Sequence, residues 1–345
     1  MPVFALSLHR EYRCRHSGAC CTAGWAIPVS GRLLPLLGTD LLVPDADGAC
    51  RYYDAPARLC RIHAAHGESM LPMSCYQFPR RALIDERGTL VALSHFCPTA
   101  ATLLCEDEAP LDVIEAPPAF PESHVYEGLD ARGAWAPLVR PGVLFDLASY
   151  SRWERFAVAA FAPERPVMAA LAELAAAAER LRAWAPDDGP FDAWVFTALS
   201  APLDGADAIE IYDRFATRDA YDTLHTLVPE GLAAPPPADP ALPPLADADW
   251  GAEQRSARRY LASRAFASWA AYEGHGLRTL IAELVVSALV LHVECRRACH
   301  AAGRALDRPL MIESIRQSDL LLVHLIDRPR LVEWLGQIED RPPSP

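Results

Sequence analysis

The chain has 345 residues, of which 51% are apolar, and a formal net charge of -13. The negative charge argues against anionic partners, so we expect neither nucleic acid nor an acidic membrane surface to bind. The sequence contains no lysine. This excludes Schiff-base and pyridoxal-phosphate lysines and the lysine of a phosphate-binding P-loop.

The sequence predicts a cytoplasmic protein of two domains, without a membrane span. No apolar run reaches the ~20 residues that cross a bilayer, and the longest, residues 284–293, lies between two glutamates. The N-terminus lacks the basic and long apolar regions of a signal peptide. The abundance of alanine, arginine and proline is typical of a GC-rich bacterial genome.

Residues 1–107 are predicted to form a small, irregular α+β domain that is rich in cysteine and binds metal. Helical periodicity is weak here, and turn signals are frequent. Strands are expected at residues 81–84 and 89–93 around a turn at 85–88, followed by a short helix at 98–106. So little apolar surface is available for burial that a bound metal would supply folding free energy, on the order of 10 kcal/mol for structural zinc.

The rest of the chain is predicted to be mostly α-helical. Residues 108–143 contain many prolines and are expected to be a connector. Residues 144–340 are expected to form a helical domain with a Pro-rich loop at 229–248. Its helices are predicted at 167–181, 207–226, 254–272, 277–302, 310–325 and 331–338. No strand leads into a glycine-rich turn, so a nucleotide-binding Rossmann fold is not supported.

Eight of the ten cysteines lie between Cys14 and Cys105, and metal binding is the usual reason for such crowding in a reducing compartment. Thiolates are preferred ligands of zinc and of iron–sulfur clusters. Buried free thiols and disulfides are the alternatives, and Cys50 and Cys105 are the members most readily explained as bystanders. The candidate metal ligands are Cys14, Cys20, Cys21, Cys50, Cys60, Cys75 and Cys97.

Adjacent cysteines at positions 20 and 21 constrain the geometry of any shared site. In an extended chain their side chains point to opposite sides. They can share one metal only in a tight turn, which Gly18 and Gly24 would permit. Otherwise they serve two different centres.

The motifs around these cysteines resemble the CxxCxxCC cysteine-cluster family, described as a zinc- or iron-chelating domain. The resemblance covers roughly residues 10–105 and is closest to the flagellin lysine-N-methylase branch. One cysteine of the named pattern is missing between Cys14 and Cys20, so a four-thiolate site must use cysteines further along the chain. The matching segments are residues 14–27 (CRHSGACCTAGWAI), 48–52 (GACRY), 60–63 (CRIH), 75–80 (CYQFPR) and 94–98 (SHFCP).

The resemblance implies methyl transfer from S-adenosylmethionine to lysine side chains, with an iron–sulfur centre and a protein substrate such as flagellin. Arg80 and His95 are the nearest polar groups that could bind the cofactor, and Arg80 could pair with a carboxylate. We expect any such site at the junction between the cysteine domain and the helical half.

Other patterns are better explained by structure than by chemistry. His292, Cys295 and Cys299 share a helix face, but that face continues a predicted core stripe. His324 is expected to be a helix histidine with its hydrogen bonds satisfied. The glycine pair at 274 and 276 is expected to form a helix–helix turn.

Two functions remain open from the sequence alone. The first is a metal-containing enzyme, most concretely one similar to a protein-lysine methyltransferase. The second is a non-catalytic zinc or iron module whose helical half binds a protein partner. An open polar cleft beside the cysteines would favour the first, and fully enclosed cysteines would favour the second.

Overall fold

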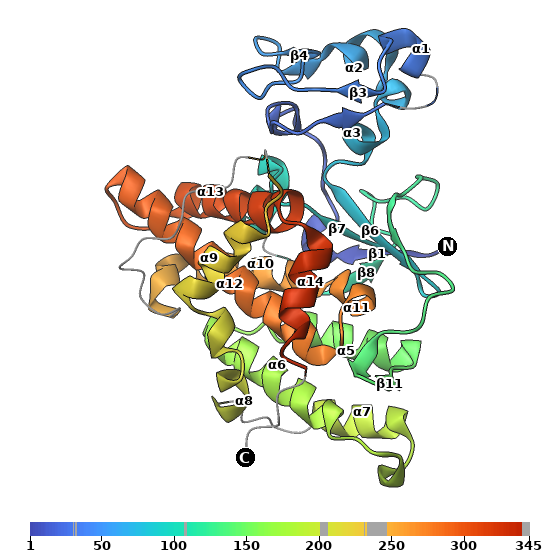
Figure 1. Cartoon of the computed structure of the whole chain (residues 1–345), viewed down its shortest axis with the longest axis vertical. Helices are drawn as coiled ribbons and strands as arrows, with labels where there is room; N and C mark the ends of the chain where they lie inside the picture. The colour runs from blue at the N-terminus through green and yellow to red at the C-terminus, as the bar shows by residue number, and fades with distance from the viewer. Residues whose placement is uncertain are drawn as a thin grey trace.

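The computed structural model describes residues 1–29, 31, 33–106, 109–200, 206–230, 232 and 247–339. Helices contain about 53% of the residues and strands about 11%. The fold is therefore mostly α with small sheets, as the sequence predicts (Figure 1).

A five-stranded sheet stands beside the helices in the order β8-β1-β7-β6-β9. The predicted hairpin is present, because β6 and β7 pair antiparallel from Arg80–Leu93 to Asp85–Gly88. The N-terminal strand β1 pairs parallel to β7 on its other side. The bounds are Val3–Leu6 (β1), Arg80–Asp85 (β6), Gly88–Leu93 (β7), Val113–Glu115 (β8) and Gly128–Asp130 (β9).

The stretch predicted as a connector supplies both edge strands of this sheet, β8 and β9. It also contributes the small β10–β11 hairpin, with β10 at Leu138–Arg140 and β11 at Val143–Leu144. Strands of two or three residues carry too little period-two pattern to be recognised in a sequence.

The helices follow the predicted ranges with three local differences. The range 207–226 is divided by a short 3-10 turn, the range 254–272 ends early and restarts, and the range 310–325 passes into a π-helical turn at Leu320–Leu325. Most of the predicted Pro-rich loop lies outside the described residues. The bounds are Pro98–Glu106 (α4), Leu147–Ala159 (α5), Val167–Arg182 (α6), Phe191–Ser200 (α7), Ala206–Glu210 (α8), Arg218–Thr226 (α9), Gln254–Ala265 (α10), Ala270–Glu273 (α11), Leu277–Ala302 (α12), Arg308–Asp319 (α13) and Arg328–Gly336 (α14).

Helix α12 is the centre of the main core and is buried on all sides from Leu277 to Cys295. One face of the sheet joins this core through Leu83 and Leu90. The opposite face has a smaller core of its own around Val91 and Phe120. None of the described helices combines the length and apolarity that crossing a membrane requires.

The cysteine segment, residues 13–79, is an excursion between β1 and β6, and its helices lie together at one end of the molecule (Figure 1). Its own core is small and centres on Ile27, Leu33 and Ile62. The remaining parts of residues 1–107 form the sheet and α4. The elements of the cysteine segment are Ile27–Pro28 (β2), Leu33–Leu37 (α1), Leu41–Leu42 (β3), Tyr53–Asp54 (β4), Leu59–Cys60 (β5), Arg61–His66 (α2) and Met73–Gln77 (α3).

Candidate metal centre

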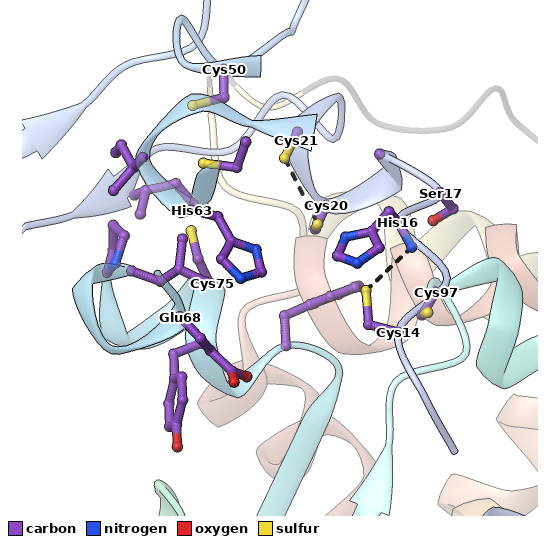
Figure 2. A pocket seen from close by; sticks show the side chains of 18 of the residues that line it. Cys14, His16, Ser17, Cys20, Cys21, Cys50, His63, Glu68, Cys75 and Cys97 are labelled. Atoms are coloured by element: carbon purple, nitrogen blue, oxygen red, sulfur yellow. Dashed lines mark hydrogen bonds between the residues drawn. The ribbon is translucent and has the colours of Figure 1, made fainter. Parts of the chain in front are cut away.

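All seven cysteines predicted as ligands line a single cavity of about 150 Å³, which we call the cysteine cavity. They reach it from separate elements: Cys60 ends β5, Cys75 lies on α3, and Cys97 directly precedes α4. Figure 2 shows Cys50 at one end of this space and Cys14 with Cys97 at the other. The fold therefore brings together thiols as distant in the chain as Cys14 and Cys97, which are 83 positions apart.

The adjacent cysteines occupy the tight turn that sharing a metal requires. Cys20 and Cys21 lie in a 3-10 turn that follows Gly18, whose φ is 79°. Their two sulfur atoms are 3.9 Å apart. Two thiolates at ~2.3 Å from one tetrahedral metal atom are separated by about 3.8 Å. The pair thus has the spacing of two ligands on one metal atom.

The other five thiols line the same cavity. Among the residues that the structure describes, no group of three or more cysteine, histidine or acidic side chains is close enough to hold a single ion. The thiols therefore surround a volume rather than a point.

Burial and mutual proximity make most of these thiols hard to ionise in the absence of metal. Burial raises the pKa of Cys75 to about 12, and the neighbouring thiols Cys20, Cys60 and Cys50 add to this shift. Burial likewise raises the pKa of Cys14. Metal binding would have to remove these protons, because thiolate is the ligand form.

Side chains other than cysteine complete the wall. The Tyr12 hydroxyl lies 3.7 Å from the sulfur of Cys97, and the backbone amide of His16 donates to the sulfur of Cys14 at 3.4 Å. Apolar side chains such as Ile27 and Ile62 also line the cavity. Apolar surface and hydrogen-bond donors to sulfur both tune thiolate-bound metals.

The remaining cysteines lie outside this cavity. Cys105 is buried in the main core, and its pKa is raised to about 11 by burial. Cys295 packs in the same core, with its sulfur 3.7 Å from that of Met311. Cys299 lies near the end of α12. The core interpretation of the helical cysteines is therefore confirmed for Cys295.

The two predicted cofactor residues occupy different places. Arg80 lines the cysteine cavity, and its guanidinium donates to the Tyr76 carbonyl at 3.2 Å. Its buried Nε has no hydrogen-bond partner. His95 is buried away from that wall, with Nδ1 3.3 Å from Asp319 and Nε2 3.1 Å from Nε2 of His9. A role for either residue in cofactor binding stays a prediction.

A second hollow of about 520 Å³, the junction cleft, lies beside the cysteine cavity and shares Phe78 and Arg80 with it. Ser94 and His324 meet in it, with their Oγ and Nε2 atoms 2.7 Å apart. Burial lowers the pKa of His324 to about 4, so this imidazole is neutral at physiological pH. The cleft is lined by Pro28, Met73, Ser74, Gln77, Phe78, Pro79, Arg80, Arg81, Ser94, Glu127, Gly128 and His324.

Sequence reasoning anticipated a hollow at the junction but missed several of its residues. His324 is a helical histidine with a hydrogen-bonded Nε2, as the sequence predicts, but its place on a π-helical turn at the border of the cleft is not predicted. π-helical turns are frequent at functional sites, yet no local sequence signal distinguishes them. Comparison of the chain with family models, curated proteins and solved structures found no match.

Proposed function

We propose that this protein binds an iron–sulfur centre, or failing that zinc, in the cysteine cavity. The observation that carries the proposal is the convergence of seven thiols on one cavity while three other cysteines of the same chain lie elsewhere. Random burial of thiols would not sort them in this way. The soft thiolate set suits iron and zinc better than magnesium or calcium.

Iron and sulfide are favoured over a lone zinc ion. A closed zinc site brings four ligands into contact around one atom. The sulfurs of Cys20 and Cys21 are that close, but no third ligand among the described residues joins them around one point, and all seven thiols border the cavity. A polynuclear centre occupies such a volume and takes its thiolates from the periphery.

We further propose that the protein is similar in activity to a lysine N-methyltransferase that uses S-adenosylmethionine, with a protein such as flagellin as substrate. Support comes from the motif resemblance over residues 10–105 and from the junction cleft beside the cysteine cavity. Arg80 borders both hollows and remains the predicted link between them. A metal centre bound in the cysteine cavity would order the chain around it and would place a charge near the junction cleft.

Anaerobic purification with iron, sulfide and zinc analysis and a visible absorption spectrum tests the metal proposal. Bound iron with equimolar sulfide is expected, together with visible absorption. Cys75→Ala should lose most of the metal, whereas Cys105→Ala, which removes a buried thiol outside the cavity, should retain it. A colourless protein that binds neither metal, or equal metal in all three proteins, would contradict the proposal.

Titration calorimetry with S-adenosylmethionine on the metal-loaded protein tests the methyltransferase proposal. Binding is expected, and Arg80→Ala should weaken it without releasing metal. No detectable binding by a fully loaded protein would instead favour the non-catalytic metal module.

A further inference from the structure

Arg81 is a cation of the junction cleft whose guanidinium forms no hydrogen bond or ion pair with a carboxylate of the described residues. Its guanidinium stacks over the ring of Trp269, 4.9 Å from the centroid. None of the hydrogen bonds or ion pairs of the described residues involves it. Arg81 is partly buried, and a charge withdrawn from water without an ion pair costs free energy.

Four charged groups act on Arg81: the guanidinium groups of Arg264 and Arg328 disfavour its charged form, and the carboxylates of Asp319 and Glu283 favour it. Arg264 and Arg328 lie nearby and share the carboxylate of Glu283. Burial, followed by the charges of these two arginines, lowers the pKa of Arg81 to about 10. The side chain therefore stays charged at neutral pH, and an oxyanion placed in the cleft would stabilise it.

Glu127 borders the same cleft and is also without a partner among the described residues. Strands β6 and β9 run parallel with Ala82 opposite Gly128, so the residues just before them, Arg81 and Glu127, enter the cleft side by side. The two charges nevertheless form no ion pair within the structure. The cleft thus presents one positive and one negative group that do not neutralise each other.

Gln77 adds a third polar group that lacks a partner. Its side chain is 5% exposed and borders the cleft, and its Nε2 donates to the carbonyl of Val125. Its Oε1 is buried without a hydrogen-bond donor. A buried acceptor without a donor costs free energy, so a donor on a bound ligand would offset that loss.

We infer that the junction cleft binds an α-amino acid head group, with its carboxylate on Arg81 and its ammonium between Glu127 and Gln77 Oε1. One planar guanidinium matches a carboxylate through two parallel hydrogen bonds. The ammonium supplies the donors that the two oxygen acceptors lack. Phe78 and Pro79 border the rest of the cleft and offer apolar surface to whatever the head group is attached to. The inference rests on the proposed function in that S-adenosylmethionine carries such a head group.

The test compares two ligands that differ in that head group. Calorimetry on the metal-loaded full chain would use S-adenosylhomocysteine and 5′-methylthioadenosine, which lacks the amino acid. The wild-type protein should bind the first at least tenfold more tightly. Arg81→Gln should weaken it by roughly tenfold to a hundredfold, the range for one charge-assisted contact, and Glu127→Gln by a smaller factor.

Matched controls separate recognition from folding. Arg132→Gln removes an exposed arginine paired with Asp130 outside the cleft, and Glu122→Gln removes an exposed carboxylate nearby. Both should leave affinity unchanged. Metal content and unfolding temperature of every variant show whether it is intact. If Arg81→Gln does not fold, Glu127→Gln at the exposed mouth of the cleft still tests the inference, because it should weaken the binding of S-adenosylhomocysteine.

The outcomes are distinct. If both ligands bind equally well and the variants have no effect, the head-group inference is wrong and the methyltransferase proposal survives. If neither ligand binds a fully loaded protein, that proposal fails and the inference fails with it. If inorganic phosphate displaces S-adenosylhomocysteine at similar concentration, Arg81 is a general oxyanion site and amino acid recognition is overturned.

Discussion

The hydroxyl of Ser94 and Nε2 of His324 lie 2.7 Å apart although 230 positions separate them in the chain. This contact joins the loop after β7 to the π-helical turn. The His324 ring also packs against Trp25 of the cysteine segment at 4.7 Å and against Phe78 and Phe96. One histidine thus connects the sheet, the cysteine segment and the helical body.

His324→Ala should loosen the cysteine segment from the helices. The change removes both the ring contacts and the bond to Ser94, with an expected loss of about 1–3 kcal/mol for an unmade buried hydrogen bond plus packing. Limited proteolysis should then cut within residues 13–79 faster. His324→Phe, which keeps the ring, should give an intermediate rate. Identical rates in all three proteins would contradict this arrangement.

Removing the proposed metal should unfold the cysteine segment while the helices persist. The segment has only a small apolar core, whereas the helical body surrounds the buried helix α12. Hydrogen exchange before and after chelation or cluster loss should show protection lost in residues 13–79 and retained in residues 277–295. Unchanged exchange in the cysteine segment would mean that its fold is independent of metal.

Gly18→Ala should lower the amount of metal bound. Gly18 has a positive φ of 79°, and a methyl group there would meet the ring of Tyr53, so the turn that pairs Cys20 with Cys21 must shift. Gly24→Ala is the matched control, because its φ is 78° but no atom lies near the added methyl group. It carries only the left-handed strain of about 1–2 kcal/mol.

Metal analysis of both glycine variants separates the effect of the contact with the Tyr53 ring from the effect of left-handed backbone strain. The double change Gly18→Ala with Tyr53→Ala removes the obstructing ring and should recover part of the metal. Equal metal loss in the two single variants would show that left-handed strain alone is responsible.

The helical body should lose stability in acid through Glu283. Burial alone would raise its pKa, but the guanidinium groups of Arg328 and Arg264 outweigh burial and hold it at about 2. Because the folded-state pKa is depressed, the stabilisation is complete above about 4.5 and is lost as the pH falls towards 2. Urea unfolding between these values should show the decline.

Glu283→Gln provides the matching substitution. It leaves the buried Arg264 and the partly buried Arg328 without their shared carboxylate, and a loss of about 3–5 kcal/mol is expected at neutral pH. The variant should also lose the part of the stability change between pH 4.5 and 2 that Glu283 contributes, whereas Asp319, whose pKa His95 and Arg264 hold well below its usual range despite burial, keeps its own part. An unchanged pH profile would show that other carboxylates govern the acid transition.

The elements that the sequence predicts correctly are those determined by patterns within a single short segment. The β6–β7 hairpin, α4 and α12 match closely, because a turn, a proline at a helix start and a long apolar repeat each lie within one segment. The seven candidate ligands line one cavity, and Cys50, which the sequence offers as a bystander together with Cys105, is among them. Cys75 and Cys97 stand in segments that resemble the cysteine-cluster motifs and line the cavity. Cys105 lies only eight positions after Cys97 but stands outside those motifs and outside the cavity.

The parts that escaped prediction depend on tertiary contacts. Strands β8 and β9 are three residues long and exist because β1 and β6 offer free edges. The surroundings of Arg81 could not be read from its motif, because they depend on the distant residues Arg264 and Arg328, which bind the carboxylate of Glu283. The π-helical turn at His324 likewise reflects packing against aromatic rings from distant segments.

The sheet gives the cysteine segment closely spaced points of departure and return. Ala5 lies opposite Val91 and Arg80 opposite Leu93, so β1 ends and β6 begins at the same end of β7, one on either side of it. Those exits are about two strand spacings apart, roughly 10 Å. A few residues could bridge that gap, so in evolution the segment could lengthen, shorten or be exchanged at this site while the sheet kept its register.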